Sequence, residues 1–120
     1  MKRLELDKNI YEIDGIDELE INDRNTPNSV FGNWFTSVKL YMSECEFRKI
    51  LNDNPGGKWY DSIVISNDDD VDYRFKKGII KELKGFFTGI NYNSKTKKVI
   101  FDIYCHEIDR RIPEKDAYIE

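Results

Sequence analysis

Apolar and polar residues alternate along several short segments of the chain, and this period of two predicts β-strands. The clearest alternation runs over residues 34–42, where Trp34, Val38, Leu40 and Met42 fall on one side of the chain. That nearly apolar side is expected to face the core. Shorter strands are expected at residues 4–6, 11–13, 19–21, 63–65, 87–92 and 99–108, with the last two forming a hairpin.

One segment follows the period of an α-helix and carries signals for its start and its end. Ser43 and Glu46 have the capping-box spacing, in which a serine hydroxyl and a glutamate three residues later satisfy free backbone N–H groups. Apolar residues follow at helical spacing, and Pro55 cannot continue a helix. We therefore expect a helix over residues 43–52.

A second helix is expected over residues 74–84. Phe75, Ile79 and Leu83 are spaced four residues apart, so they would share one face of a helix. Gly78 lies inside this segment and lowers helix stability by about 1 kcal/mol relative to alanine. The rival interpretation makes the same segment another strand.

Together these elements predict a single α+β domain over residues 1–120. It would contain an antiparallel sheet of about five to six strands and two short helices, and the alternative is an all-β protein. A length of 120 residues suits one domain, and 39% hydrophobic and 13% aromatic residues favour a packed core over disorder. No apolar run approaches the roughly 18 residues of a membrane span, and the first residues lack a signal-peptide pattern, so we expect a cytoplasmic protein without membrane contact.

Charge is concentrated in blocks, although the net charge is only −4. Residues 61–72 contain five aspartates and no basic residue, whereas residues 74–98 contain eight basic residues against Glu82 alone. Such blocks produce strong local potentials even when the total charge is small. They are the main functional signal in the sequence.

The acidic run at Asp68, Asp69, Asp70 and Asp72 has three interpretations. It can be a solvated turn whose side chains bond nearby backbone groups. It can also be a calcium-binding loop, because Asp68, Asp70 and Asp72 have the spacing of the first, third and fifth ligands of an EF-hand. However, the sixth and twelfth positions, which need glycine and glutamate, are Tyr73 and Ile79. The third interpretation is a surface for a basic partner, which crowded carboxylates attract quickly.

Catalytic and metal-binding patterns are incomplete. His106 is the only histidine, and as the strand neighbour of Cys105 it would face away from that thiol. Zinc would require Cys45, Cys105 and His106 to converge from distant segments, and the Gly-Gly-Lys at 56–58 lacks the rest of a phosphate loop. We therefore expect no enzyme, no metal and no cofactor, and two reduced cysteines.

The leading functional hypothesis is a small acidic inhibitor of immunity type, which neutralises a toxin or a host-defence protein by binding and occluding it. Fixed carboxylates would cover a basic site on that partner. The short acidic chain resembles bacterial immunity proteins and phage anti-defence proteins in general character, although no family motif carries the likeness. The expected partner-binding residues are Asp68, Asp69, Asp70, Asp72, Trp59 and Tyr60.

The alternative hypothesis is a protein that sequesters a nucleotide or another phosphorylated ligand through the basic 74–98 segment. Basic side chains would hold the phosphates while an aromatic ring stacks on the base. The expected ligand-binding residues are Lys77, Lys81, Lys84, Phe86, Tyr92, Arg110 and Arg111. Neither hypothesis excludes a homo-oligomer.

Overall fold

A computed structural model of the protein describes residues 2–22, 34–54, 58–67, 70–85 and 92–110. At residues 18–22, 34, 70–72 and 109–110 it describes the backbone. Four of the residues that the sequence singles out, Asp68, Asp69, Phe86 and Arg111, lie outside the described residues.

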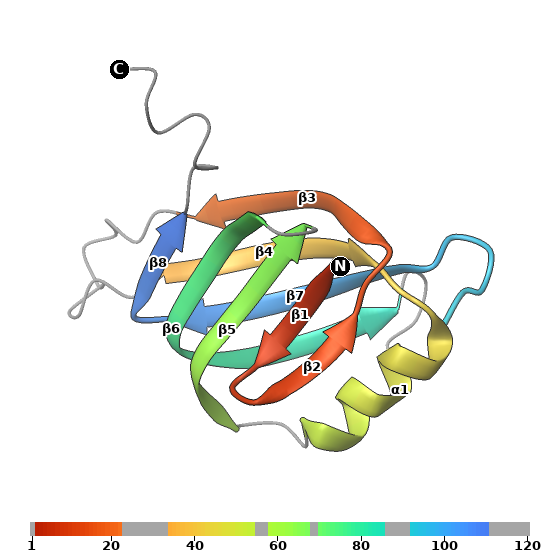
Figure 1. The fold of residues 1–120 in the computed structure, drawn as a ribbon, viewed down its shortest axis with the longest axis horizontal. Coiled ribbons are helices and arrows are strands. Elements are labelled where there is room, and N and C mark those ends of the chain that lie inside the picture. The colour runs from red at the N-terminus through yellow and green to blue at the C-terminus, as the bar shows by residue number, and fades with distance from the viewer. Residues whose placement is uncertain (1, 23–33, 55–57, 68–69, 86–91, 111–120) are drawn as a thin grey trace.

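The described residues form eight antiparallel strands and one helix (Figure 1). The strand order is β2-β1-β5-β6-β7-β4-β3, and β8 pairs with β6 next to the end of β7. The elements are β1 (Arg3–Leu6), β2 (Asn9–Glu12), β3 (Gly15–Asn22), β4 (Trp34–Tyr41), α1 (Glu44–Asp53), β5 (Trp59–Asn67), β6 (Asp70–Gly85), β7 (Lys98–Cys105) and β8 (Glu107–Arg110).

The predicted α+β class with two helices is therefore wrong, and the chain is closer to the all-β alternative. The first predicted helix is confirmed as α1, whereas residues 74–84 belong to the long strand β6. The predicted strand at 34–42 is confirmed by β4, in which Val38 and Leu40 are fully buried. The strands predicted at 4–6, 11–13, 19–21, 63–65 and 99–108 correspond to β1, β2, β3, β5 and β7 with β8.

The spacing of apolar residues in the segment 74–84 resembles that of a helix because the strand contains two irregularities. Its buried positions are 75, 78, 80 and 85, with residue 83 partly buried, so the spacing alternates between two and three residues. Lys77 has a positive φ of 51°, and the pairing of β6 with β7 shifts between Ile80 and Glu82, which leaves Lys81 as an extra residue. Each irregularity adds an outward residue, so the average period lies between those of a strand and a helix.

The predicted hairpin also needs correction. Both edges of β7 are occupied, by β4 on one side and by the second half of β6 on the other. The strand that precedes β7 in its hairpin is therefore β6, which ends at Gly85. Residues 87–91, which we expected to form that arm, lie outside the described residues.

Three neighbouring strands reverse their inside-outside alternation along one line across the sheet. The line passes through Asp61 in β5, Lys77 in β6 and His106 between β7 and β8, and we call it the crease. Inward-facing residues lie three positions apart across it: Tyr60 and Ile63 on β5, Phe75 and Gly78 on β6, and Cys105 of β7 and the partly buried Ile108 of β8. Figure 1 shows β5 and β6 bending sharply at this position.

Gly78 allows the strands to approach closely at the crease. A Cβ atom at this position would lie 3.0 Å from the Ile63 Cδ1 atom and 3.5 Å from the Cys105 Cβ atom. The bend thus brings the two halves of the sheet together as two layers, in the way that bent strands form the corners of orthogonal β-packings.

The core lies between these two layers. One layer contains β1, β2, β8, most of β5 and the first half of β6, and the other contains the second half of β6 with β7, β4 and β3. In Figure 1 the β1–β2 hairpin lies in front of β7 and of the end of β6. The largest fully buried side chains are Tyr60, Phe47, Phe75, Phe101, Leu4, Leu6, Leu40, Met42, Ile50, Ile63, Ile65 and Ile80.

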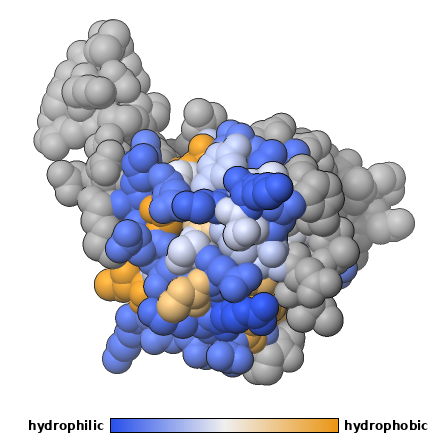
Figure 2. Space-filling view, turned by 90° about the vertical axis from the view of Figure 1, so that its right-hand side faces the viewer, coloured by the Kyte–Doolittle hydropathy of each residue, from blue (hydrophilic) through white to orange (hydrophobic). Residues whose placement is uncertain are grey.

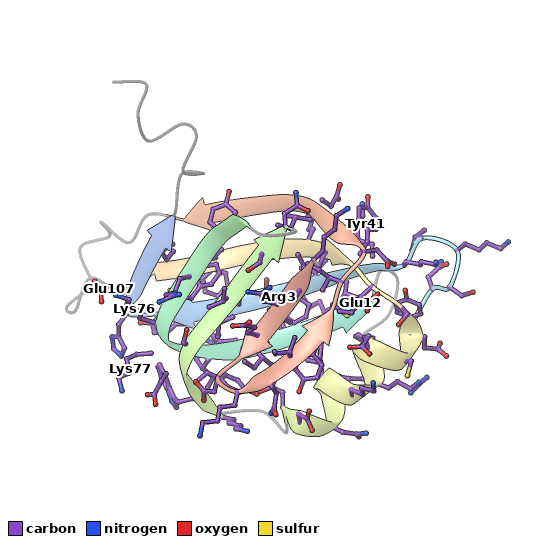
Figure 3. The ribbon with its side chains drawn as sticks, in the orientation of Figure 1. Arg3, Glu12, Tyr41, Lys76, Lys77 and Glu107 are labelled. Carbon is purple, nitrogen blue, oxygen red and sulfur yellow. The ribbon has the colours of Figure 1, made fainter. Side chains whose placement is uncertain are left out.

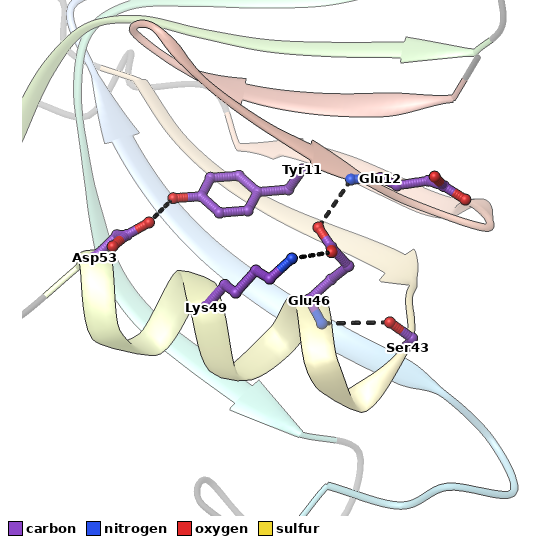
Figure 4. Close-up of polar contacts among 6 residues, drawn as sticks. All are labelled: Tyr11, Glu12, Ser43, Glu46, Lys49 and Asp53. Carbon is purple, nitrogen blue, oxygen red and sulfur yellow. Dashed lines mark hydrogen bonds and ion pairs between the residues drawn. The ribbon is translucent and has the colours of Figure 1, made fainter.

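Helix α1 holds the edge strand β2 through polar contacts (Figure 4). The Ser43 hydroxyl accepts a hydrogen bond from the Glu46 N–H at 3.3 Å, which confirms the N-cap. The Glu46 carboxylate does not bond back to Ser43 as a capping box would; it accepts from the Glu12 backbone N–H at 3.1 Å. At the other end of the helix, the Tyr11 hydroxyl donates to the Asp53 carboxylate.

The end of the molecule that carries α1 presents a mainly hydrophilic surface (Figure 2). Apolar residues form only small separate patches in the coloured part of that view. Charged and polar side chains of the helix, such as Glu44, Arg48, Lys49 and Asn52, are exposed. Because larger apolar patches are typical of binding sites, the coloured part of this end is a weaker candidate for a binding site than the outer face of the sheet.

Candidate functional site

An apolar row crosses four neighbouring strands on the outer face of the sheet. Trp59 on β5 lies opposite Ile79 on β6, Ile79 lies opposite Tyr104 on β7, and Tyr104 lies opposite Phe35 on β4. All four point away from the core, because the described residue that follows each of them in its strand, Tyr60, Ile80, Cys105 or Thr36, is buried. Side chains at directly opposed positions are about 5 Å apart, so these four form one continuous surface that we call the outer row.

Trp59 is the most exposed member of the outer row. About half of it, 51%, is exposed, and among the described residues only Ile10 on β2 is a comparably exposed large hydrophobic residue. The Trp59 ring stacks on the ring of His106 from the crease, with centroids 5.6 Å apart and planes inclined by 19°. The contact limits the movement of Trp59 while leaving half of its surface accessible.

Charged side chains flank the outer row on the side of the crease. The Lys77 ammonium lies 2.8 Å from the Asp61 carboxylate, and both side chains are largely exposed. Figure 3 shows Lys77 pointing away from the sheet, beside Lys76 and Glu107. This ion pair raises the pKa of Lys77, mainly through the hydrogen bond to Asp61.

A second charged group flanks the other side of the row. The Lys84 ammonium lies 2.9 Å from Glu82 and 3.8 Å from Asp102, which is opposite Glu82 on β7. The hydrogen bond from Lys84 lowers the pKa of Glu82, whereas burial and the bond to Glu82 raise the pKa of Asp102. The positive charge of Lys84 is thus compensated by the two acidic side chains beside it.

A shallow groove of about 460 Å³ lies between the β1–β2 turn and the start of β5. Asp7 shapes the groove: it has a positive φ of 56°, and its backbone N–H donates to the Ser62 carbonyl at 2.9 Å. Its carboxylate accepts from the Ser62 N–H at 3.0 Å. The lining residues are Leu6, Asp7, Lys8, Asn9, Lys58 and Asp61.

The predicted partner-binding residues that the structure describes fall at two ends of the β5–β6 hairpin. Trp59 is exposed at one end, while Tyr60 is only 1% exposed and its hydroxyl donates to the Asn54 side chain at 3.3 Å. Asp70 begins β6 at the other end, opposite Asn67. The pairing shifts between Ile65 and Ser66, which leaves Asp72 as the extra residue of a bulge.

The predicted ligand-binding residues that the structure describes do not share one site. Lys77 and Lys84 are engaged in the ion pairs above, and the Lys81 ammonium lies 6.0 Å from the centre of the Tyr104 ring. The Tyr92 hydroxyl donates to the Met42 carbonyl, and the Tyr92 ring packs on Phe47 of α1. Tyr92 therefore belongs to the helix packing, away from the lysines of β6, and Arg110 lies in β8.

Sequence reasoning missed most of the outer row. Phe35 and Tyr104 could be assigned to outward faces from alternation alone, but nothing in the sequence shows that they are opposite each other. Ile79 was expected on a helix, and His106 was given no role. The pairing register, which depends on residues far apart in the chain, is what brings them together.

Other features of the described residues do not form a site. The described parts of the chain contain no cluster of three or more metal-binding side chains, and none of their helices is long and apolar enough to cross a membrane. Cys45 is exposed in α1, and Cys105 is buried in the core.

Comparison with protein-family models, with curated proteins and with solved structures finds no match to this chain. Function therefore has to be inferred from the residues and their geometry.

Proposed function

We propose that the protein is a small cytoplasmic inhibitor of immunity type, which binds a basic protein partner and occludes it. The observation that carries the proposal is the outer row, in which Trp59 is half exposed and aligned with three apolar side chains across four strands. Protein interfaces are commonly built this way, with a few aromatic anchors at the centre and charged residues around them.

The charge around the outer row supports a protein partner over a phosphate-rich one. Lys77 is paired with Asp61, and Lys84 is paired with Glu82 and Asp102, so the charges of these two lysines beside the row are compensated. Binding of nucleic acid generally requires a face with a clear excess of basic residues. The net charge of −4 favours a partner of the opposite sign.

The acidic run would contribute at the far end of the same hairpin. Trp59 and Asn67 are the first and last residues of β5, and because the strand bends at the crease they are at most about 26 Å apart. A partner that contacts both Trp59 and the acidic run would lie along the hairpin. That length is compatible with an interface of standard size.

The substitution Trp59→Ala is expected to weaken partner binding by about 2 kcal/mol, which is roughly thirtyfold, because a central tryptophan anchor is removed. Tagged protein would be used to capture partners from cells of the source organism, with quantitative mass spectrometry of the bound proteins. The matched control is Ile10→Ala, which removes the other exposed large hydrophobic residue. Equal losses in the two variants would contradict the proposed surface.

One contact favours the alternative of a nucleotide or other phosphorylated ligand. Lys81 is exposed and lies over the ring of Tyr104, so an aromatic ring and a cation are adjacent on the outer row. This site would bind the ligand without the Tyr92 contact that the sequence suggested.

Under the inhibitor proposal, nucleotides at saturating concentration are expected to leave the melting temperature unchanged. A ligand that binds only the folded state stabilises it by about 2.7 kcal/mol at a hundred times its dissociation constant, which would raise the melting temperature by several degrees. Differential scanning fluorimetry with a panel of mono-, di- and triphosphates measures this directly. A rise of several degrees that Lys81→Gln removes would favour the alternative.

A further inference from the structure

Trp59 and Asp61 present two complementary groups on the same side of β5. Tyr60 between them is buried, so the two side chains project outward, about 7 Å apart along the strand. The aromatic ring is half exposed, and the side chain of Asp61 is 81% exposed. His106 stacks on one face of this ring, so a flat cation would stack on the opposite face and bond to the carboxylate at the same time.

The molecule already holds a cation at this position. The Lys77 ammonium lies 2.8 Å from the Asp61 Oδ1 atom. Asp61, and to a smaller extent Asp7, raise the pKa of Lys77, so the local field favours positive charge at the crease. The basic residues nearby do not abolish that preference.

The internal contact is weak enough to be replaced. Both partners are exposed, with 67% of the Lys77 side chain and 81% of the Asp61 side chain accessible. Ion pairs of this kind shift an equilibrium by about fivefold at most. A partner's side chain that also contacts Trp59 would therefore compete successfully with Lys77.

We propose that the crease receives an arginine side chain of the protein partner, with its guanidinium group between the Trp59 ring and the Asp61 carboxylate. Arginine fits better than lysine because its planar group stacks on aromatic rings and offers several N–H donors in one plane. In this arrangement Lys77 is an internal competitor that moves aside. The inference rests on the proposed function, since it names the chemistry of the same partner.

The test uses the full-length protein labelled with ¹⁵N and the peptide acetyl-Gly-Arg-Gly-amide. The indole N–H signal of Trp59, assigned from its loss in Trp59→Phe, is followed by NMR during titration. We expect saturable binding in the millimolar range, and about fivefold weaker binding to the variant Asp61→Asn. We expect Lys77→Gln to strengthen binding about twofold to threefold, because the competitor is removed.

Three controls give the experiment its power to contradict the inference. The peptide acetyl-Gly-citrulline-Gly-amide has the same shape without the charge, so equal binding of both peptides would overturn it. Lys76→Gln makes the same charge change one residue away, so an effect equal to that of Lys77→Gln would also overturn it. A larger indole shift with inorganic pyrophosphate than with the arginine peptide would point to an anion site instead.

Failure of this experiment can be distinguished from failure of the proposed function. If the arginine peptide does not bind while Trp59→Ala still loses partner capture selectively, the outer row remains the interface and only the arginine contact is wrong. If both results fail, the interface itself is wrong.

Discussion

Replacing Phe101 by alanine is expected to lower the free energy of unfolding by about 3–5 kcal/mol. Phe101 is 1% exposed on β7, which lies between β6 and β4, and it is one of the largest fully buried side chains in the core between the two layers. Truncation would remove its buried surface and leave a cavity that the paired strands on both sides cannot collapse. Urea denaturation followed by circular dichroism measures the change.

The control for this prediction is Ile100→Ala, one position earlier on the same strand. Ile100 faces outward between Lys84 and Lys39 and is only partly buried, so its truncation is expected to cost less than half as much. Similar losses for the two variants would mean that the assignment of inner and outer faces along β7 is wrong.

Raising the pH above 10 is expected to destabilise the protein strongly, because several tyrosines keep their protons only while the chain is folded. Burial raises the pKa of Tyr11, Tyr60 and Tyr92, and the hydrogen bond to Asp53 raises that of Tyr11 further. In the unfolded chain a tyrosine ionises near pH 10. The stabilisation from these groups is therefore complete below pH 10 and is lost as the pH approaches the folded pKa values.

The expected loss is about 1.4 kcal/mol for each pH unit above 10 and for each of these tyrosines that stays protonated in the folded state. Urea midpoints measured at pH 8, 9, 10 and 11 follow it. The variant Tyr11→Phe should be less stable than the parent at pH 8, since the bond to Asp53 is lost, and should show a shallower decline above pH 10. Parallel declines in the two proteins would contradict this role for Tyr11.

Strand alternation and the helix-capping pattern predicted the regular parts of the fold from sequence. Residues 34–42 and the segment that begins at Ser43 behave as their local patterns require, because nothing interrupts their periods. The prediction of a helix over residues 74–84 was wrong because Lys77 and Lys81 interrupt the period of two. The spacing of buried residues in a strand with such interruptions resembles that of a helix. The shared crease could not be foreseen from any one strand.

The candidate site was harder to predict than the fold. Trp59 could be chosen as an exposed aromatic anchor, but Tyr60 beside it is part of the core. The pairing of Lys77 with Asp61 crosses two strands and joins the acidic and basic blocks that the sequence presents as separate.

Because β6 runs through both layers, it affects how the protein unfolds. Residues near Asp70 pair within one layer, and residues near Gly85 pair within the other, yet they belong to one strand, β6, despite its two irregularities. Unfolding of either layer would remove hydrogen-bonding partners from the backbone of β6. Neither layer is therefore expected to be stable without the other. The protein should lose its structure as one cooperative unit, without a half-folded species.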